Sequence, residues 1–173
     1  MKAKLPELKR ELEGLPQPEL VRICLRLAKH KIENKELLDY LLWSSDDPMA
    51  YAEAFKAEVL LPFEMPFVNA YSFTKSIRKS LRLVTKYLRF TATRQGESEL
   101  LLSIVERFHS TYRREYRNGA LAKIMFRCLK KVATNIAKLH EDIQADFTGQ
   151  YNELLRLSIN RLGQEYAENQ TYL

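Results

Sequence analysis

Apolar residues in the second half of the chain recur at steps of three and four, the spacing of a helix with one buried face. The helices that this pattern predicts cover residues 71–92, 98–117, 120–143 and 148–166. Their connections near Gly96, Gly119 and Asp146 are short, so neighbouring helices should run antiparallel. No segment alternates apolar and polar residues as a half-buried strand does. We therefore expect an all-α fold, either a mostly antiparallel helical bundle or a short helical array.

Shorter helices are predicted before these four. Their ranges are 5–13, 18–31, 35–44 and 48–60. Gly14 follows the first of them, and Pro18 falls in the first turn of the second, where a missing N–H costs nothing. Asp47 precedes Pro48 with the side chain of an N-cap, and Pro62 ends the last of these helices. The chain thus predicts short N-terminal helices followed by four longer ones.

An apolar segment with two prolines, residues 61–68, joins the two parts. Proline lacks a backbone donor, so the segment makes a poor helix and a poor central strand. Because the segment is so hydrophobic, we expect it to pack against the core rather than to form an exposed hinge. Residues 1–173 should then form a single all-helical domain. The alternative is a subdivision into a short-helix region, 1–61, and a long-helix bundle, 67–173.

Composition narrows the class of protein. The 173 residues include only 5 glycines and 6 prolines, and 46% of them are hydrophobic, which excludes a disordered or collagen-like chain. The phosphate-binding glycine motifs G-x-G-x-x-G and G-x-x-x-x-G-K-[ST] are absent from the sequence. Cys24 and Cys128 lie far apart and outside any C-x-x-C pair, so we expect neither a disulfide nor zinc. No secretory signal opens the chain and no membrane span is present, so a cytoplasmic protein is expected.

Three segments resemble a known family. They are LPELKREL at residues 5–12, ELV at 19–21 and KSIRKSL at 75–81. In these segments the chain is similar to a family of uncharacterised all-helical bacterial proteins of comparable length. The resemblance implies an all-helical fold over most of the chain, and it brings no established activity or catalytic residues.

The formal net charge of +6 is distributed unevenly along the chain. Residues 1–70 carry 10 basic and 12 acidic side chains, residues 71–140 carry 16 and 4, and residues 141–173 carry 2 and 6. The basic excess therefore belongs to the middle of the chain, where a surface for an anionic partner is expected.

Two predicted helices and the segment between them carry this excess. The first helix places six cations within about 100° of arc, opposite its apolar stripe, and no acid occurs between residues 71 and 95. The second helix repeats the arrangement, and Tyr112 and Tyr116 accompany three arginines between the two helices. The candidate residues for binding a polyanion or partner are Lys75, Arg78, Lys79, Arg82, Lys86, Arg89, Arg113, Arg114, Arg117, Lys123, Arg127, Lys130 and Lys131.

Several interpretations of these cations stay open. They can form a solvated face, they can be covered by the acidic terminal blocks, or they can bind an acidic protein or a nucleic acid, with the tyrosines stacking on unpaired bases. We expect a non-catalytic interaction or scaffold protein with a cationic face that binds an acidic protein or nucleic acid. A homo-oligomer is also left open.

The alternative function is a helical bundle that binds a small molecule, or an enzyme, with its site between helices. Glu106 and His109 are the candidates for this site, because they share the E-x-x-H spacing of di-iron helices. Such a centre needs a second copy of the motif and two further glutamates, so no metal and no cofactor are expected. The sequence also contains no nucleophile motif of the G-x-S-x-G type, which favours a protein that is not an enzyme.

Overall fold

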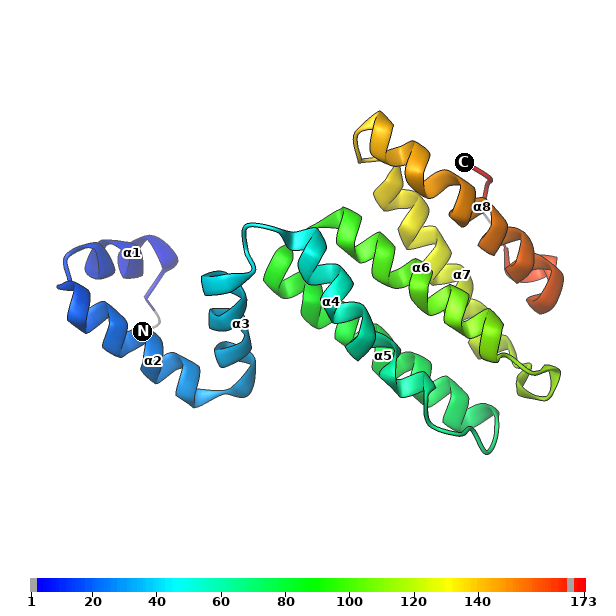
Figure 1. Ribbon diagram of the computed structural model, residues 1–173, viewed down its shortest axis with the longest axis horizontal. Helices are drawn as coiled ribbons and strands as arrows, with labels where there is room; N and C mark the ends of the chain where they lie inside the picture. The colour runs from blue at the N-terminus through cyan, green and yellow to red at the C-terminus, as the bar shows by residue number, and fades with distance from the viewer. Residues whose placement is uncertain (1–2, 168–169) are drawn as a thin grey trace. The chain divides into compact units, whose positions relative to one another are not determined.

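The computed structural model describes residues 3–167 and 170–173 (Figure 1). Within these residues the chain forms eight α-helices, three short 3-10 helices and no strand, so the expected all-α fold is confirmed. The α-helices are α1 (Leu5–Glu13), α2 (Gln17–His30), α3 (Ile32–Trp43), α4 (Pro48–Leu60), α5 (Ala70–Thr91), α6 (Arg94–Thr111), α7 (Gly119–Ile136) and α8 (Glu141–Leu162). The 3-10 helices are η1 (Leu61–Phe63), η2 (Arg114–Tyr116) and η3 (Gln164–Tyr166).

The chain divides into two compact units, residues 1–46 and 47–173. This division falls before α4, whereas the sequence suggested a subdivision between residues 61 and 67. The reason is that α4 and the proline-containing segment belong to the core of the second unit, where Pro62 and Phe63 are buried. The expectation that this segment packs against the core is therefore confirmed for these two residues, whereas Leu61, Met65 and Val68 are exposed.

The first unit contains α1, α2 and α3 and has little core of its own. Helices α2 and α3 pack against each other, and the Asn34 side chain donates a hydrogen bond to the Leu27 carbonyl at 2.9 Å. Among the described residues of these three helices, Tyr40 alone is buried. Large apolar side chains that are exposed in this unit are Leu5, Leu8, Leu12, Val21, Leu25, Leu27, Ile32, Leu41, Leu42 and Trp43.

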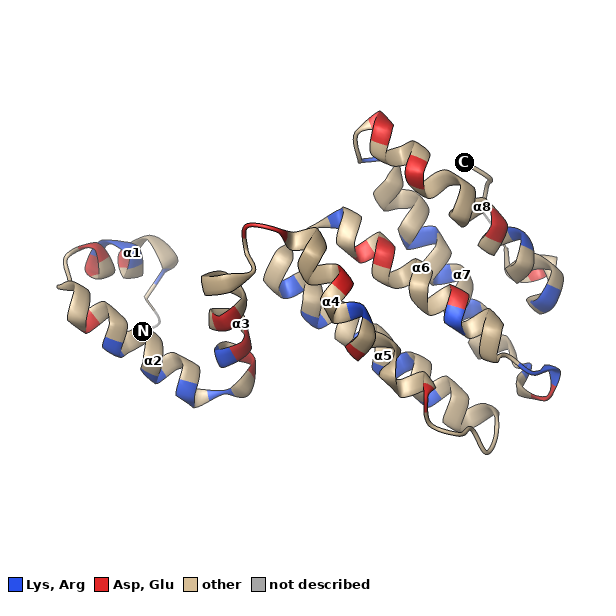
Figure 2. Cartoon of the chain, viewed as in Figure 1, with Lys and Arg blue, Asp and Glu red and all other residues tan. Residues whose placement is uncertain are grey.

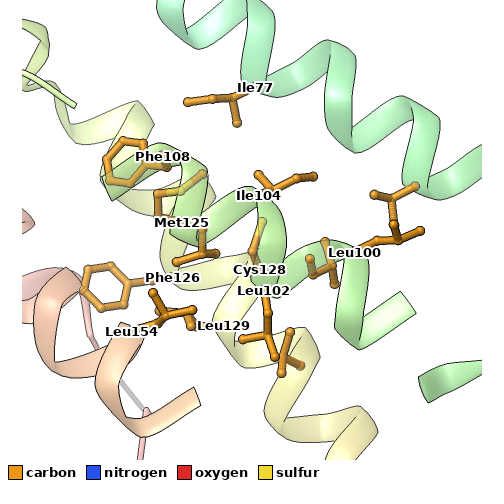
Figure 3. Close-up of a cluster of buried hydrophobic side chains, with 14 of the residues drawn as sticks. Ile77, Leu100, Leu102, Ile104, Phe108, Met125, Phe126, Cys128, Leu129 and Leu154 are labelled. Atoms are coloured by element: carbon orange, nitrogen blue, oxygen red, sulfur yellow. The ribbon is translucent and has the colours of Figure 1, made fainter. Parts of the chain in front are cut away.

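Helix α6 lies at the centre of the second unit and packs against α4, α5, α7 and α8 (Figure 1). Its sequence explains this position, because apolar side chains cover about half of its circumference and a stripe this wide is buried only when several helices pack around it. Leu100, Leu102 and Ile104 are fully buried, and Figure 3 shows them among Met125 and Leu129 of α7. Of the described helices, none is both long and apolar enough to cross a membrane.

The turn between α5 and α6 lies earlier than predicted. The sequence placed it at Gly96, but the chain turns at Ala92, whose φ of 52° is left-handed, and α6 already begins at Arg94. Gly96 instead allows a close approach between helices. A Cβ atom on Gly96 would lie 2.1 Å from the Tyr87 hydroxyl, and this hydroxyl is fixed because it donates a 2.9 Å hydrogen bond to the Pro48 carbonyl.

Two other predicted helices end early. Helix α6 ends at Thr111 rather than residue 117, because the buried Tyr116 donates a hydrogen bond to the Phe67 carbonyl and holds the following residues in η2. Asn118 then caps α7, its side chain accepting a hydrogen bond from the Leu121 backbone at 2.8 Å. Helix α7 ends at Ile136 rather than residue 143, and α8 begins at Glu141 after the extended His140.

Candidate cationic groove between α5 and α7

Helix α5 presents the first basic stripe because its opposite face is buried. Asn69 and Ser72 form a capping box at its start, in which the Ser72 backbone donates to the Asn69 side chain at 2.9 Å. Phe73, Ile77 and Val84 point into the core. The cations on the other side of α5, apart from Lys86, are consequently exposed.

Helices α5 and α7 both pack on α6 and leave a groove between them. The groove has a volume of about 460 Å³. Its apolar floor is formed by side chains of all three helices, and cations line its edges. The lining residues are Arg78, Leu81, Val84, Thr85, Glu97, Leu101, Ala120, Lys123, Ile124, Arg127, Cys128 and Lys131. We call this feature the α5–α7 groove, and Figure 2 shows basic residues along the two helices that border it.

Three of the four groove cations have no acidic partner. Arg78, Lys123 and Arg127 are exposed, and no described carboxylate lies within 4.0 Å of their charged nitrogens. Lys131 is different, because its ammonium lies 3.4 Å from the carboxylate of Glu97. Arg78 reaches the groove from α5 and the other two from α7, so the uncompensated positive charge is on both edges.

Glu97 is the one acid in the lining of the groove, and sequence reasoning did not single it out. Its side chain is buried and accepts a 2.6 Å hydrogen bond from the amide of Asn135, which is also buried. A buried carboxylate needs such partners, and Lys131 supplies the balancing charge. The pair Glu97–Lys131 therefore anchors α7 on α6 and leaves the other cations available.

The remaining predicted cations of α5 and α7 lie outside the groove. Lys75, Lys79, Arg82, Arg89 and Lys130 are exposed and absent from its lining. The structure thus brings only part of each basic stripe to a shared site.

Lys86 faces α4 instead of the groove. Its ammonium lies 3.9 Å from the carboxylate of Glu58 and 5.9 Å from the centre of the Phe55 ring. Half-buried among these partners, Lys86 contributes to the packing of α4 on α5.

The acidic C-terminal block does not cover the α5–α7 groove. Helix α8 packs on α6 and α7, yet it contributes no residue to the lining of the groove. The acids Glu141, Asp142, Asp146 and Glu153 of α8 are exposed. For the part of the chain that the structure describes, none of them pairs with a cation of α5 or α7.

The three arginines after α6 lie away from the groove. Arg113 pairs with Glu115 at 3.8 Å, whereas Arg114 and Arg117 line a separate pocket at the end of α6.

The neighbouring tyrosines are held by packing. Tyr116 is buried with its ring tilted against Phe73, and half-buried Tyr112 packs on Phe108 with ring centres 5.0 Å apart. Tyr116 therefore offers no open face for base stacking, and one side of the Tyr112 ring is occupied by Phe108.

Glu106 and His109 have different surroundings despite their shared helical face. Glu106 is exposed, whereas His109 is buried and its Nε2 lies 2.8 Å from the hydroxyl of Ser158. Burial, together with the charge of Arg161, lowers the pKa of His109 to about 4. Among residues 3–167 and 170–173, no group of three or more His, Cys, Asp or Glu could hold a metal ion.

Cys128 lies in the lining of the groove but is not a reactive thiol. The residue is buried, and burial raises the pKa of its thiol to about 12. A buried thiol with so small a thiolate fraction at neutral pH is a poor nucleophile. Cys128 therefore contributes apolar surface to the groove, as free cysteines often do in protein interiors.

The α5–α7 groove thus combines an apolar floor with positive charge on two edges, an arrangement suited to an amphipathic and acidic ligand. No family model, curated protein or solved structure matches the chain. The resemblance to a family of uncharacterised all-helical bacterial proteins accordingly stays a prediction.

Proposed function

We propose that the protein is a non-catalytic interaction protein whose second unit binds an acidic, amphipathic helix of a protein partner in the α5–α7 groove. One observation carries this proposal. Arg78, Lys123 and Arg127 stand without acidic partners on the edges of a groove whose floor is apolar. Exposed cations alone are common on protein surfaces. Cations that border an apolar groove, in contrast, require a ligand that has both negative charge and an apolar face.

A helical peptide satisfies both requirements. Its apolar residues, spaced three and four apart, would contact Leu81, Leu101 and Ile124 on the floor. Acidic residues on either side of this apolar stripe would approach Arg78 on one edge and Arg127 on the other. The volume of about 460 Å³ is enough for a few anchoring side chains of such a helix.

A nucleic acid fits the groove less well. Single-stranded nucleic acids bind through stacking on aromatic side chains as well as through phosphate contacts. The lining of the groove contains no aromatic residue, and Tyr112 and Tyr116 are packed elsewhere. An apolar aliphatic floor therefore favours a protein partner over a nucleic acid.

The proposal can be tested with a designed probe. The probe is a fluorescent peptide of about 15 residues, with leucines at helical spacing and glutamates on both flanks, long enough to form a helix on binding. A matched peptide carries lysines in place of the glutamates, and a single-stranded oligothymidylate represents nucleic acid. Fluorescence anisotropy with the full chain measures binding of each probe. We expect the acidic peptide to bind most tightly.

Two triple variants with the same change in charge separate the groove from the overall charge of the protein. Arg78→Glu/Lys123→Glu/Arg127→Glu alters the groove, and Lys75→Glu/Lys79→Glu/Lys130→Glu alters exposed cations of the same helices outside it. Reversing three charge contacts should weaken peptide binding about 100-fold, while the control should weaken it by less than about fivefold. Equal losses in the two variants, or tighter binding of the oligothymidylate, would contradict the proposal.

A further inference from the structure

A second pocket lies at the C-terminal end of α6, where the chain continues into η2 and where α8 ends. Its volume is about 490 Å³. Polar and charged side chains form it, in contrast to the apolar floor of the α5–α7 groove. The lining residues are His109, Ser110, Tyr112, Arg114, Arg117, Asn160 and Arg161. We call it the arginine pocket, and Figure 2 shows the basic residues of the loop after α6 and of the end of α8.

Three guanidinium groups converge on this pocket without an acid to neutralise them. Arg114, Arg117 and Arg161 are exposed, and the lining includes neither Asp nor Glu. None of the three forms an ion pair with a carboxylate in the described residues. Arg161 also donates a hydrogen bond to the His109 carbonyl, which places a positive charge at the negative end of the α6 dipole.

Tyr112 lines the pocket together with the three arginines. Burial raises the pKa of the Tyr112 hydroxyl, and the charges of all three arginines act in the opposite direction on this one group. The hydroxyl has no hydrogen-bond partner although it is inaccessible to solvent. An unpaired buried hydroxyl is costly, so a ligand oxygen that accepted its hydrogen bond would be bound favourably.

His109 offers the complementary group, a hydrogen-bond acceptor. The Ser158 hydroxyl donates to the Leu154 carbonyl at 2.8 Å and therefore accepts from His109 Nε2. The hydrogen-bond network thus assigns the proton to Nε2 and leaves Nδ1 unprotonated, buried and without a partner. The wall of the arginine pocket consequently contains one unsatisfied donor and one unsatisfied acceptor beside three cations.

We infer that the arginine pocket binds the phosphate group of a small molecule. Guanidinium groups are planar and bind phosphate oxygens through paired hydrogen bonds, and three of them more than balance the two negative charges of a phosphate monoester. The volume of about 490 Å³ lies in the range of small-molecule sites and leaves space for an organic group beside the phosphate. Tyr112 and His109 form part of the wall beside this phosphate site.

This site is separate from the proposed protein-binding groove. Both are built on α6, but Leu101 lines the groove and His109 lines the arginine pocket, eight residues later. At about 1.5 Å per residue these positions lie roughly 12 Å apart along the helix axis. Binding at one site can therefore be measured while the other is altered.

The test is isothermal titration calorimetry of the full chain at constant ionic strength with glucose 6-phosphate, inorganic phosphate and glucose. We expect saturable binding of glucose 6-phosphate to one site per chain and no binding of glucose. Equal affinities for the two phosphate compounds would identify free phosphate as the ligand, and tighter binding of glucose 6-phosphate would identify an organic phosphate.

Two variants and a matched control locate the site. Arg114→Gln and Arg117→Gln should each weaken binding of glucose 6-phosphate about tenfold, because each removes charged hydrogen bonds. Arg113→Gln removes the same charge from a neighbouring exposed residue that pairs with Glu115 and lies outside the pocket, so its effect should stay below about twofold. Circular dichroism checks that the variants fold. The inference is overturned if neither phosphate compound binds saturably, or if the control weakens binding as much as Arg117→Gln does.

Discussion

The α5–α7 groove and the arginine pocket are both cationic and both built on α6, yet different surfaces surround their charges. In the groove, Arg78 and Arg127 border aliphatic side chains such as Leu81 and Ile124. In the pocket, arginines surround a polar wall with two unsatisfied hydrogen-bonding atoms. Positive charge attracts an anion to either site, but the lining determines which anion fits. We therefore propose an amphipathic peptide for the groove and a compact phosphate for the pocket.

The largest expected effect concerns His109 in the wall of the arginine pocket. The pKa of His109 is lowered from 6.5 to about 4 in the folded chain. Between these pH values His109 therefore binds a proton in the unfolded chain but not in the folded chain. Stability should therefore fall as the pH drops from about 6.5 to about 4. Because a pKa difference of one corresponds to about 1.4 kcal/mol, the loss from His109 should reach about 3 kcal/mol.

Urea unfolding at several pH values measures this loss, and the variant His109→Gln isolates it from the titration of carboxylates. The variant should lose less stability than the wild type over the same interval. If both proteins lose the same amount, His109 is not a buried neutral group. The groove contains no histidine, so the effect belongs to the pocket end of α6.

The second prediction concerns the groove end of α6. Gly96→Ala would place a methyl group against the fixed Tyr87 hydroxyl and force α5 away from α6. We expect a loss of about 1–3 kcal/mol in the free energy of unfolding, together with weaker peptide binding and unchanged phosphate binding. Thermal or urea unfolding and the two binding assays measure these effects.

Gly149→Ala is the matched control, because nothing lies within 4 Å of a Cβ at that position of α8. It should be neutral or stabilising by up to about 1 kcal/mol, since alanine favours the helix. A Gly96 variant as stable as this control would show that α5 and α6 do not approach as closely as described.

The third prediction exchanges apolar for polar surface in the groove. Ile124 is half-buried on its floor, so Ile124→Ser should weaken binding of the acidic peptide about tenfold through loss of apolar contact. Binding of glucose 6-phosphate should be unchanged, and anisotropy and calorimetry measure the two affinities. Peptide binding that is insensitive to this substitution would mean that charge alone holds the peptide.

The smallest expected effect is the response to salt. Raising the ionic strength from about 0.1 M to 1 M shortens the Debye length from about 10 Å to 3 Å and screens exposed charges. Peptide binding should weaken only about threefold, because contact with the apolar floor persists. Glucose 6-phosphate has no apolar contact to retain, so its affinity should fall further. A steeper loss of affinity for the peptide than for the phosphate compound would show that charge contributes more to binding in the groove than in the pocket.

Helical periodicity made most of the fold predictable, because the apolar stripe of α5 is also its buried face. The same pattern placed Arg78 opposite the apolar stripe of α5 but left open whether the cations are covered, and the structure leaves Arg78 and Arg127 exposed. Helix boundaries were less predictable. Gly96, for example, permits a close contact with Tyr87 and does not lie in a turn. A local sequence pattern does not reveal a contact between two helices.

The sites were predictable only in part for the same reason. Sequence grouped Lys86 with the other cations of α5, but its partner Glu58 comes from another helix. The arginine pocket joins His109 to Arg161, residues that meet only because α8 folds back along α7 and so runs beside α6 in the same direction. Charge counts along the chain therefore identified the basic region, whereas tertiary packing divided it into two different sites.

The most direct measurement of the proposed function is the amide chemical-shift change in ¹⁵N-labelled full chain on titration with the acidic peptide. The largest changes should map to the α5–α7 groove, at residues such as Thr85, Leu101 and Ile124, with little change at Ser110 and Asn160 of the arginine pocket. Changes confined to exposed cations outside the groove, such as Lys75 and Lys130, or to the first unit would contradict the proposed function.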